Sequence, residues 1–424
     1  MIPGVLVLYC RHAFYRHAAT VYENIDAYAR YSRFPVWSIN TELGLPAQLP
    51  SMRFAAVLLH YTVFARGHEY ELSQPFLDYL DGCAGSLKIA VFQDEYRNCP
   101  KRFGFVNDYD IDVVYTLLEP EYHDEVYGKY TDASRIVYHI PGYVDSALAA
   151  TAARFSRPID DREIDVGYRA RRLPYYMGRG AQEKGSIVGQ FVSACEERGL
   201  KLKLDIVSDC RLYGDNWSMF MANCKSMLGV EAGVSIFDLD GTVQRRCEEF
   251  LAQYPDADFE SVAARILHEY EDNIPYRTIS PRHFEAAAFR TCQILFEGNY
   301  SGILEPGKHY IPLRKDFSNF DDVISQFTDP ETRDRISETA YQDLIESGRY
   351  SYEGFVRTFD QLLSRLGIDE PCTTFDKEKI ELQLHGDLTS RRRWAIIKAL
   401  PNHFRQMNFP GRAVARRIFR SLKR

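Results

Sequence analysis

The chain has 424 residues, more than the ~250–300 at which a single hydrophobic core usually stops growing, so we expect two domains. Hydrophobic residues make up 45% and charged residues 26% of the sequence, fractions that are typical of a folded globular protein. The formal net charge of -7 argues against a nucleic-acid-binding protein, because such proteins normally present an excess of Lys and Arg to phosphates.

Two further classes are disfavoured by the sequence. No apolar run approaches the ~18–20 residues that span a bilayer, and the N-terminus MIPGVLVLYC lacks the basic region and cleavage site of a signal peptide. The nine cysteines are odd in number and contain no C-x-x-C pair, so we expect reduced thiols in a cytoplasmic protein rather than a disulfide framework.

Short apolar runs alternate with helix-length segments from the start of the chain. The expected strands are VLVLYC, FPVWSI, FAAVLLHY, KIAVFQ, IDVVYTLL and RIVYHI, with helices over residues 15–31 and near residues 72–80. Continuous Val, Ile and Leu runs separated by helices indicate a parallel sheet covered on both faces. Residues 1–145 are therefore predicted to form a Rossmann-like domain.

A second series of strands follows residues 146–162, which have no strand pattern and are predicted to be a linker. Its members are EIDVGYR, KLDIVSD, SMLGVEAG, TCQILF and HYIPL, again with helices between them. Residues 163–350 are therefore predicted to form a second α/β domain with a parallel sheet. Residues 351–384 contain an amphipathic closing helix, and residues 385–424 form a basic, amphipathic helical tail.

Three segments resemble a known family. YHIPGYVD resembles the stretch with which group-1 retaining glycosyltransferases leave their first domain, GRGAQEKG is similar to their GR…KG loop, and SPRHFEAAAFRTCQILFE resembles half of their E-x7-E motif. The second domain as a whole most resembles the spore-maturation-type glycosyltransferase-like proteins of bacterial polysaccharide clusters. The resemblance implies a GT-B fold, in which the first domain binds an acceptor and the second binds a sugar nucleotide across a cleft.

The segment SPRHFEAAAFRTCQILFE contains the main donor-binding candidates. Ser280 and Pro281 predict a helix start, where backbone amides attract phosphate. The resemblance implies that Glu285 binds ribose hydroxyls. The first Glu of the motif should lie eight residues earlier, but position 277 is Arg, and Glu231 at a probable strand end is the candidate for the missing carboxylate. The alternative is a capped core helix with a solvated Glu.

A diphosphate leaving group develops negative charge, so a metal-independent transferase without cofactors needs fixed cations beside it. Guanidinium groups bind phosphate oxygens in bidentate fashion, and Lys contributes a point charge. Ser301 and Gly302 are further donor-binding candidates, and solvated surface is the alternative for any single Arg. The cations near GRGAQEKG that we assign to the phosphates are Arg169, Arg171, Arg179 and Lys184.

Loops that follow the strands of the first domain supply the catalytic candidates, because a doubly wound sheet presents function there. His12 follows the first strand and would contact the transferred sugar or orient the acceptor. Asp94 and Glu95 follow KIAVF, where a carboxylate would act as general base toward an acceptor hydroxyl. The alternatives are a hydrogen-bonded packing histidine and an acidic helix cap.

Two other functions compete with glycosyl transfer. SIFDLDGT matches the D-x-D-G-T loop of haloacid-dehalogenase-like phosphatases, with Asp238 as nucleophile and Asp240 as acid and base. Lys315 and the pair Asp321-Asp322 would complete such a site, but the first domain would then have no role. The incomplete E-x7-E motif also allows a non-catalytic, sugar-binding scaffold with a glycosyltransferase-like fold.

The C-terminal segment, residues 391–424, contains eleven Lys and Arg and no Asp or Glu. Apolar residues alternate with these at helical spacing, so the segment would bind an anionic membrane surface or, alternatively, an acidic protein surface. The sequence therefore predicts a cytoplasmic glycosyltransferase, peripheral at the inner membrane if the tail binds lipid. Its substrates would be a nucleotide sugar and a glycan or lipid-linked acceptor, as in lipopolysaccharide O-antigen synthesis, with no nucleic-acid partner.

Overall fold

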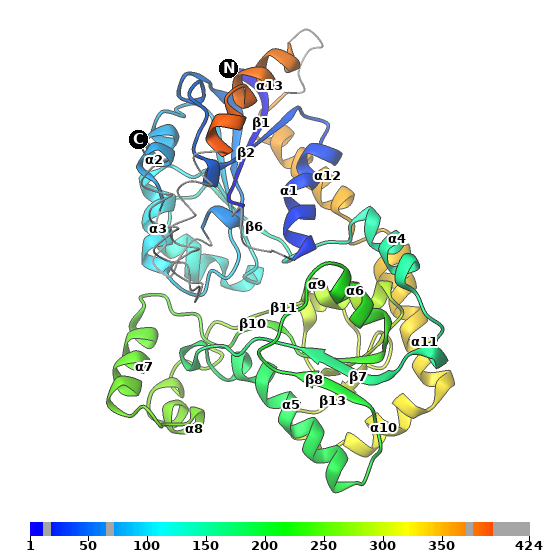
Figure 1. Ribbon diagram of the computed structural model, residues 1–424. Coiled ribbons are helices and arrows are strands. Elements are labelled where there is room, and N and C mark those ends of the chain that lie inside the picture. Colours follow the sequence, from blue (N-terminus) through cyan, green and yellow to red (C-terminus); the bar gives the residue numbers. More distant parts are fainter. Residues whose placement is uncertain (12–17, 65–71, 370–375, 393–424) are drawn as a thin grey trace, which may run out of the picture.

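The computed structural model describes residues 1–11, 18–64, 72–369 and 376–392 (Figure 1). These residues form two α/β domains, each built around a parallel sheet, in the upper and lower parts of Figure 1. The predicted architecture of two Rossmann-like sheets is therefore confirmed. His12 and most of the basic tail, residues 393–424, lie outside the described residues.

The first sheet has six strands in the order β2-β1-β3-β4-β5-β6, and all neighbouring pairs are parallel. All six residues of β3 are buried, as a continuous apolar run predicts for a strand covered on both faces. The strand order changes direction between β1 and β3. The elements are β1 (Ile2–Tyr9), α1 (Ala19–Tyr31), β2 (Val36–Asn40), β3 (Phe54–Leu59), α2 (Gln74–Asp81), β4 (Leu87–Val91), α3 (Cys99–Asp108), β5 (Val113–Thr116) and β6 (Arg135–Tyr138).

The second sheet has five parallel strands in the order β13-β12-β9-β7-β8. The order changes direction between β7 and β9, and ligands of doubly wound sheets bind beyond the carboxyl ends of the strands at such a point. The elements are β7 (Ile164–Arg169), α5 (Arg179–Glu197), β8 (Leu204–Val207), α6 (Asp215–Ala222), β9 (Cys224–Gly229), α9 (Pro281–Ala288), β12 (Cys292–Phe296), β13 (Ile311–Leu313), α10 (Phe320–Thr328) and α11 (Pro330–Tyr341).

An insertion separates β9 from α9. It contains the short antiparallel strands β10 (Ala232–Val234) and β11 (Tyr276–Thr278), with α7 (Thr242–Gln253) and α8 (Phe259–Val262) between them. Gly233 has a φ of +91°, and a Cβ there would lie 1.9 Å from the Tyr276 carbonyl oxygen, so only glycine fits this ladder. Sequence patterns predicted helix for this region but missed the two strands.

The insertion packs into the core of the first domain. Val234, Phe237 and Tyr276 belong to the same hydrophobic cluster as Tyr96 and the buried side chains of the first sheet. The rings of Tyr96 and Tyr276 lie 5.4 Å apart, edge to face, and the Asp238 amide donates a hydrogen bond to the Tyr96 carbonyl at 3.0 Å. The two domains therefore share a core beside the carboxyl edges of both sheets.

The chain passes between the two domains at two further segments, which lie side by side. Helix α4 (Ser146–Phe155) occupies part of the stretch predicted as a linker, between the end of β6 and the start of β7. The chain returns to the first domain at α12 (Tyr352–Arg365), where Phe359 packs edge to face on Tyr28 of α1 at 5.3 Å between ring centroids. Backbone hydrogen bonds join Val144 to Tyr350 and Tyr352 at the crossing.

The last described helix, α13 (Lys377–His385), docks on the first domain. Leu384 is fully buried there, and the Arg391 guanidinium donates to the Gly44 carbonyl at 3.1 Å. The base of the basic tail is therefore fixed to the first domain. No helix within the described ranges is long and apolar enough to cross a membrane, and the eight cysteines among these residues are all free thiols.

Candidate donor site between the two domains

The start of α5 carries the GRGAQEKG loop. Lys184 points toward β10 and donates to the Gly233 carbonyl at 2.9 Å. Burial lowers the pKa of Lys184 to about 8, against the opposing effect of the Asp94 carboxylate. Arg179 is exposed and forms a bidentate pair with Glu260 of α8, at 2.8 and 2.9 Å. Both of these predicted phosphate ligands therefore contact the insertion, Lys184 at Gly233 and Arg179 at Glu260.

Helix α9 begins as the sequence predicts. Ser280 is its N-cap, Pro281 is its first residue, and His283 completes a capping box by accepting from the Ser280 amide at 3.1 Å. The Arg282 amide donates to Ser280 Oγ at 3.4 Å, and the His283 amide donates to the Ser280 carbonyl at 2.9 Å. Because Pro281 has no N–H, little of the first turn is left to bind an anion.

Glu285 lies one turn into α9 and is half-buried. Trp217 of α6 donates its indole N–H to Glu285 Oε2 at 2.9 Å. Burial raises the pKa of Glu285, and the Trp217 hydrogen bond and the Arg282 charge oppose that rise. On the first domain, burial and the charges of Asp145 and Glu285 raise the pKa of Glu23 to about 7, so Glu23 of α1 lies within electrostatic range of Glu285.

Glu231 stands just beyond the end of β9, where the sequence predicted a carboxylate. Its Oε1 accepts the backbone amides of Asn299 and Tyr300 at 3.0 and 2.9 Å. A Cβ at Gly298 would lie 2.6 Å from the Glu231 carboxyl carbon, so this glycine is required for the close approach. Burial raises the pKa of Glu231. Its observed contacts position the loop after β12.

The other predicted residues of this loop are Ser301 and Gly302. Ser301 has a φ of 58°, and its hydroxyl accepts the Ile279 amide at 3.2 Å and bonds Thr278 Oγ1 at 2.8 Å. Gly302 also has a positive φ, +66°. Both residues therefore shape the turn that joins the loop after β12 to the start of α9.

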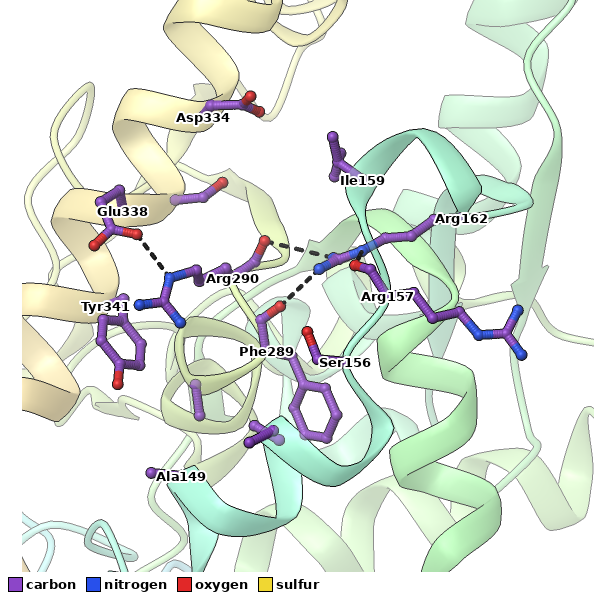
Figure 2. A pocket seen from close by; sticks show the side chains of 14 residues that line it. Ala149, Ser156, Arg157, Ile159, Arg162, Phe289, Arg290, Asp334, Glu338 and Tyr341 are labelled. Carbon is purple, nitrogen blue, oxygen red and sulfur yellow. Dashed lines mark hydrogen bonds and ion pairs between the residues drawn. The ribbon is translucent and has the colours of Figure 1, made fainter.

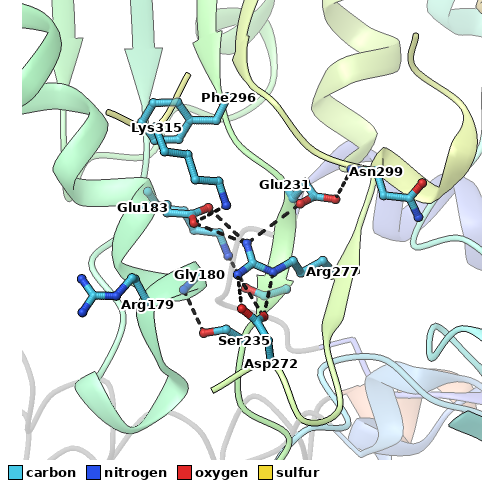
Figure 3. A network of polar contacts seen from close by, with 12 residues as sticks. Arg179, Gly180, Glu183, Glu231, Ser235, Asp272, Arg277, Phe296, Asn299 and Lys315 are labelled. Carbon is cyan, nitrogen blue, oxygen red and sulfur yellow. Dashed lines mark hydrogen bonds and ion pairs between the residues drawn. The ribbon is translucent and has the colours of Figure 1, made fainter. Parts of the chain in front are cut away.

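Arg277, which replaces the expected first Glu of the motif, is the centre of a charged network (Figure 3). It pairs with Glu183 of α5 at 3.3 Å and with Asp272 at 3.1 Å, and it lies 4.0 Å from Glu231. Lys315, beyond β13, pairs with Glu183 at 2.7 Å. The network joins α5, the insertion and the loops after β9 and β13 at the carboxyl edge of the second sheet.

Arg169 and Arg171 differ in the structure. Arg169 is buried, pairs with Asp205 at 2.8 Å, and lies over the Phe220 ring at 4.1 Å, so its charge is already neutralised and its role in phosphate binding does not fit this position. The Arg169 carbonyl accepts Nη1 of Arg282 at 2.6 Å. Arg171 is exposed, beyond the end of β7.

The two catalytic candidates in the described part of the first domain, Asp94 and Glu95, differ in their exposure to solvent. Asp94 is exposed with a φ of 53°, and it acts electrostatically on Lys184, so it faces the donor side. Glu95 is fully buried and accepts hydrogen bonds from the Leu117 amide at 2.8 Å, the Tyr127 hydroxyl and the Tyr276 hydroxyl at 3.1 Å. This position does not fit a general base for an acceptor, because the carboxylate is enclosed and joins the two domains.

The sequence missed three residues near the site: Arg282, Trp217 and Glu23. Arg282 lies in SPRHFEAAAFRTCQILFE, and its position two residues after the N-cap Ser280 is the signal that could have identified it. Trp217 and Glu23 had no signal, because only the tertiary fold brings α6 and α1 toward Glu285.

The FDLDGT loop serves as a helix cap rather than as a nucleophile loop. Asp238 is buried and accepts the amides of Val243 and Gln244 at 3.3 and 2.9 Å, at the start of α7. It follows the short antiparallel strand β10 rather than a strand of the parallel sheet. Lys315 is paired with Glu183. The phosphatase alternative therefore does not fit this arrangement.

A pocket of about 650 Å³ lies at the opposite end of α9 (Figure 2). Arg162 in its wall is buried and donates to the carbonyls of Phe289 and Cys224, both at 2.9 Å. Arg290, also in the wall, pairs with Glu338 at 2.7 Å. Eight residues of helix span about 12 Å, so this pocket is separate from the site near Ser280.

The two parallel sheets, joined by the insertion that packs on the first domain at Tyr96 and by α12, which returns to the first domain, define a GT-B glycosyltransferase fold. Among solved structures, the chain is similar to an alpha-glucosyltransferase in complex with UDP and a 13-mer DNA containing a HMU base. The TM-score is 0.52 at 10% identity, over 86% of this chain and 99% of that one. A second structure, alpha-glucosyltransferase in complex with UDP, gives a TM-score of 0.51 at 10% identity, over 85% and 99% of the chains.

The chain is also similar to TarM, at 12% identity and a TM-score of 0.40 over 73% of this chain and 54% of TarM, so it spans about half of that protein. No protein-family model matches the sequence, and a search of curated proteins gave no match. The similarity therefore lies in the fold.

Proposed function

We propose that the chain is a glycosyltransferase that moves a sugar from a nucleotide-sugar donor to a glycan or lipid-linked acceptor. The observation that supports this most directly is that Lys184 of α5 and Glu285 of α9 lie near the starts of two helices at the carboxyl edge of the second sheet, and that the charge of Arg282 acts on both. Ligands of such sheets bind at this edge. A cation and a carboxylate there match the phosphate and ribose of a nucleotide.

In this proposal the donor lies against the second domain. Lys184 contacts the diphosphate, Glu285 accepts hydrogen bonds from ribose hydroxyls, and Arg171 is free to approach the phosphates from the exposed loop after β7. Fixed cations can stabilise the diphosphate that leaves as the glycosidic bond breaks, so we propose that the reaction needs no bound metal. UDP is the first nucleotide to test, because solved structures with this fold are complexes with UDP.

The acceptor would lie against the first domain. Its hydroxyl oxygen attacks the anomeric carbon, the bond from that carbon to the diphosphate breaks, and the hydroxyl proton passes to a carboxylate. Asp94 is the described residue that suits this role, because it is exposed and faces Lys184. His12 keeps its proposed role beside the transferred sugar.

The biological setting that we propose is synthesis of a bacterial surface polysaccharide, such as lipopolysaccharide O-antigen, at the cytoplasmic side of the inner membrane. Support comes from the eleven Lys and Arg of residues 391–424, whose base is fixed to the first domain at Arg391. Deleting residues 393–424 leaves the buried Leu384 and Arg391 in place. The deletion should abolish flotation with anionic vesicles, and unchanged flotation would contradict membrane binding by the tail.

A thermal-shift screen of nucleoside diphosphates and sugar nucleotides tests the donor site. Glu285→Gln keeps an oxygen for the Trp217 indole but removes the charge, so it should weaken binding of the best sugar nucleotide by about tenfold, or ~1.4 kcal/mol. Glu338→Gln is the matched control. Glu338 is a surface carboxylate of α11 that pairs with Arg290, just beyond the far end of α9. Equal donor affinity and turnover in Glu285→Gln and wild type would overturn the assignment.

The same thermal-shift screen distinguishes a transferase from the alternative function, a non-catalytic sugar-binding scaffold. Its supporting observation is Arg277, which stands where the motif has a carboxylate and is occupied by Glu183 and Asp272. A protein that binds a polysaccharide but is not stabilised by any sugar nucleotide would be a binding module rather than a transferase.

A further inference from the structure

Arg282 is held in one orientation by two contacts. Its Nη1 donates to the Arg169 carbonyl at 2.6 Å, and its guanidinium carbon lies 5.3 Å from the centroid of the Trp217 ring. Neither contact neutralises its charge. Within the described ranges, Nε and Nη2 of Arg282 donate to no protein atom, and the side chain forms no ion pair.

Nearby arginines of the second domain are different. Arg169 pairs with Asp205, Arg179 is bidentate to Glu260, and Arg277 pairs with two carboxylates. Each of these charges is balanced inside the protein. Arg282 is instead oriented by a carbonyl and an indole ring, which leave the Nε and Nη2 edge available. This edge has the geometry that binds two oxygens of one phosphate.

The backbone amides at this edge of the sheet are largely occupied. Serine and carbonyl oxygens accept the first amides of α9, and the insertion accepts those of α5: Glu271 takes the Arg179 amide at 2.8 Å, and Ser235 takes the Gly180 amide at 2.9 Å. The usual source of positive potential for a phosphate is therefore reduced here. Side-chain cations have to supply it.

Arg282 and Lys184 are both anchored to the end of β7: the Arg169 carbonyl accepts Nη1 of Arg282 at 2.6 Å, and the hydroxyl of the preceding residue, Tyr168, donates to the Lys184 carbonyl at 3.1 Å. The charge of Arg282 contributes, after burial, to the lowered pKa of Lys184, about 8. The other charged groups that act on Lys184 are Asp94 from the loop after β4, Glu183 from α5 and Arg277 from β11. Holding two cations together is unfavourable unless an anion lies between them, and such arrangements are typical of functional sites.

We propose that Arg282 is a donor-binding residue, which binds the diphosphate of the sugar nucleotide through its Nε and Nη2 edge opposite Lys184. This rests on the proposed function and adds a third cation to Lys184 and Arg171. The ligand class is a nucleoside diphosphate, and the indole of Trp217 keeps the guanidinium plane fixed for it.

Arg282→Gln tests this, with Arg290→Gln as the control at the other end of α9. Calorimetric titration with UDP, UMP and uridine should show a loss of about 10- to 100-fold for UDP in Arg282→Gln, a smaller loss for UMP and no change for uridine. Arg290→Gln should stay within about twofold of wild type for all three. Arg282→Lys, which restores the charge without the planar fork, should recover part of the UDP affinity.

The pH dependence checks the electrostatic coupling between the two cations, whereas the series of UDP, UMP and uridine tests the contact with phosphate itself. UDP is fully ionised above pH ~7, so wild-type affinity should fall as Lys184 loses its proton with rising pH. In Arg282→Gln the neighbouring positive charge is absent, the pKa of Lys184 rises, and the fall should move to higher pH.

Failure of the proposed function can be distinguished from failure of the Arg282 assignment. If wild type binds neither UDP nor ADP nor GDP, the proposed function is wrong and this inference falls with it. If wild type binds one of them and Arg282→Gln binds it equally well, or loses uridine to the same extent, only the assignment of Arg282 is wrong.

Discussion

Replacing Arg277 tests whether the charged network supports the fold of the donor site. The Arg277 side chain is 17% exposed, and its partners Glu183 and Glu231 are 11% and 7% exposed. Arg277→Met keeps the length of the side chain and removes the charge. Removing one partner of a buried pair typically costs about 3–5 kcal/mol, because a carboxylate remains buried without its cation.

The expected cost here is smaller, roughly 2–3 kcal/mol, for two reasons visible in the contacts. Glu183 keeps Lys315 at 2.7 Å, and Glu231 keeps two backbone amides. The third partner, Asp272, is 56% exposed, so water replaces the lost guanidinium there. The control is Lys315→Met, which removes a cation that is 46% exposed and should cost at most about 1 kcal/mol.

The pH dependence has a definite sign. Burial raises the pKa of Glu231 and Arg277 lowers it, so the pKa rises further in Arg277→Met. A carboxyl group whose folded pKa exceeds its unfolded value of ~4.3 destabilises the fold above that pH range and ceases to do so below it. The stability difference between wild type and variant should therefore be largest near pH 7 and shrink toward pH 4.5.

Scanning calorimetry at several pH values, supported by urea unfolding, measures both effects. The reasoning would be refuted if Arg277→Met cost no more than Lys315→Met, or if the difference grew as the pH fell. Either result would mean that the carboxylates of the network do not depend on Arg277 for their burial.

Three further substitutions test the contacts between and within the domains. Tyr276→Phe removes the hydroxyl that donates to Glu95 and should cost about 1.5–3 kcal/mol in urea unfolding, whereas Tyr300→Phe, which loses a bond to a neutral carbonyl, should cost about 0.5–1.5 kcal/mol. Equal losses in the free energy of unfolding would show that the hydrogen bond from Tyr276 to Glu95 contributes no more to stability than a bond to a neutral carbonyl. Arg162→Met removes the donor to two carbonyls, that of Phe289 at the end of α9 and that of Cys224 in β9, and should cost at least about 2 kcal/mol. A urea midpoint equal to that of wild type would contradict this.

Much of the fold follows from the sequence because its strands are local, continuous apolar runs. Central strands of the two parallel sheets coincide with runs such as FAAVLL or CQILF that are buried on both faces, whereas the edge strands β6 and β8 are only partly buried. The strands β10 and β11 have three residues each and include Gly233, so they carry no alternation, and their pairing depends on a partner across the whole insertion. A sequence pattern cannot report such non-local pairing.

The site was predictable only where a single segment builds it. Ser280 and Glu285 lie on one helix, whose cap can be identified from the residues themselves. Glu95 looked like an exposed carboxylate after a strand, but Tyr127 and Tyr276, from distant parts of the chain, enclose it. Arg169 likewise meets Asp205 from the neighbouring strand. Glu95 and Arg169 are both enclosed by side chains from elsewhere in the chain, and a local sequence pattern cannot indicate such burial.

The position of Arg277 also explains why half of the E-x7-E motif is absent. Counting eight residues back from Glu285 gives a residue of β11, the second strand of the insertion, rather than the end of β9. The insertion thus separates the two halves of the motif, and the spacing of eight has no structural meaning here. The residue that follows β9 is Val230, and Glu231 comes next, so Glu231 stays the predicted candidate for the first carboxylate of the motif. Its Oε1 accepts two backbone amides of the loop after β12, and its Oε2 lies 4.0 Å from Arg277 Nη1. Glu285 Oε2 accepts the Trp217 indole, and Glu285 Oε1 has no protein donor or ion-pair partner among the described residues. Glu231 is therefore already engaged by two amides and a cation, and Glu285 is the better candidate to accept a ribose hydroxyl.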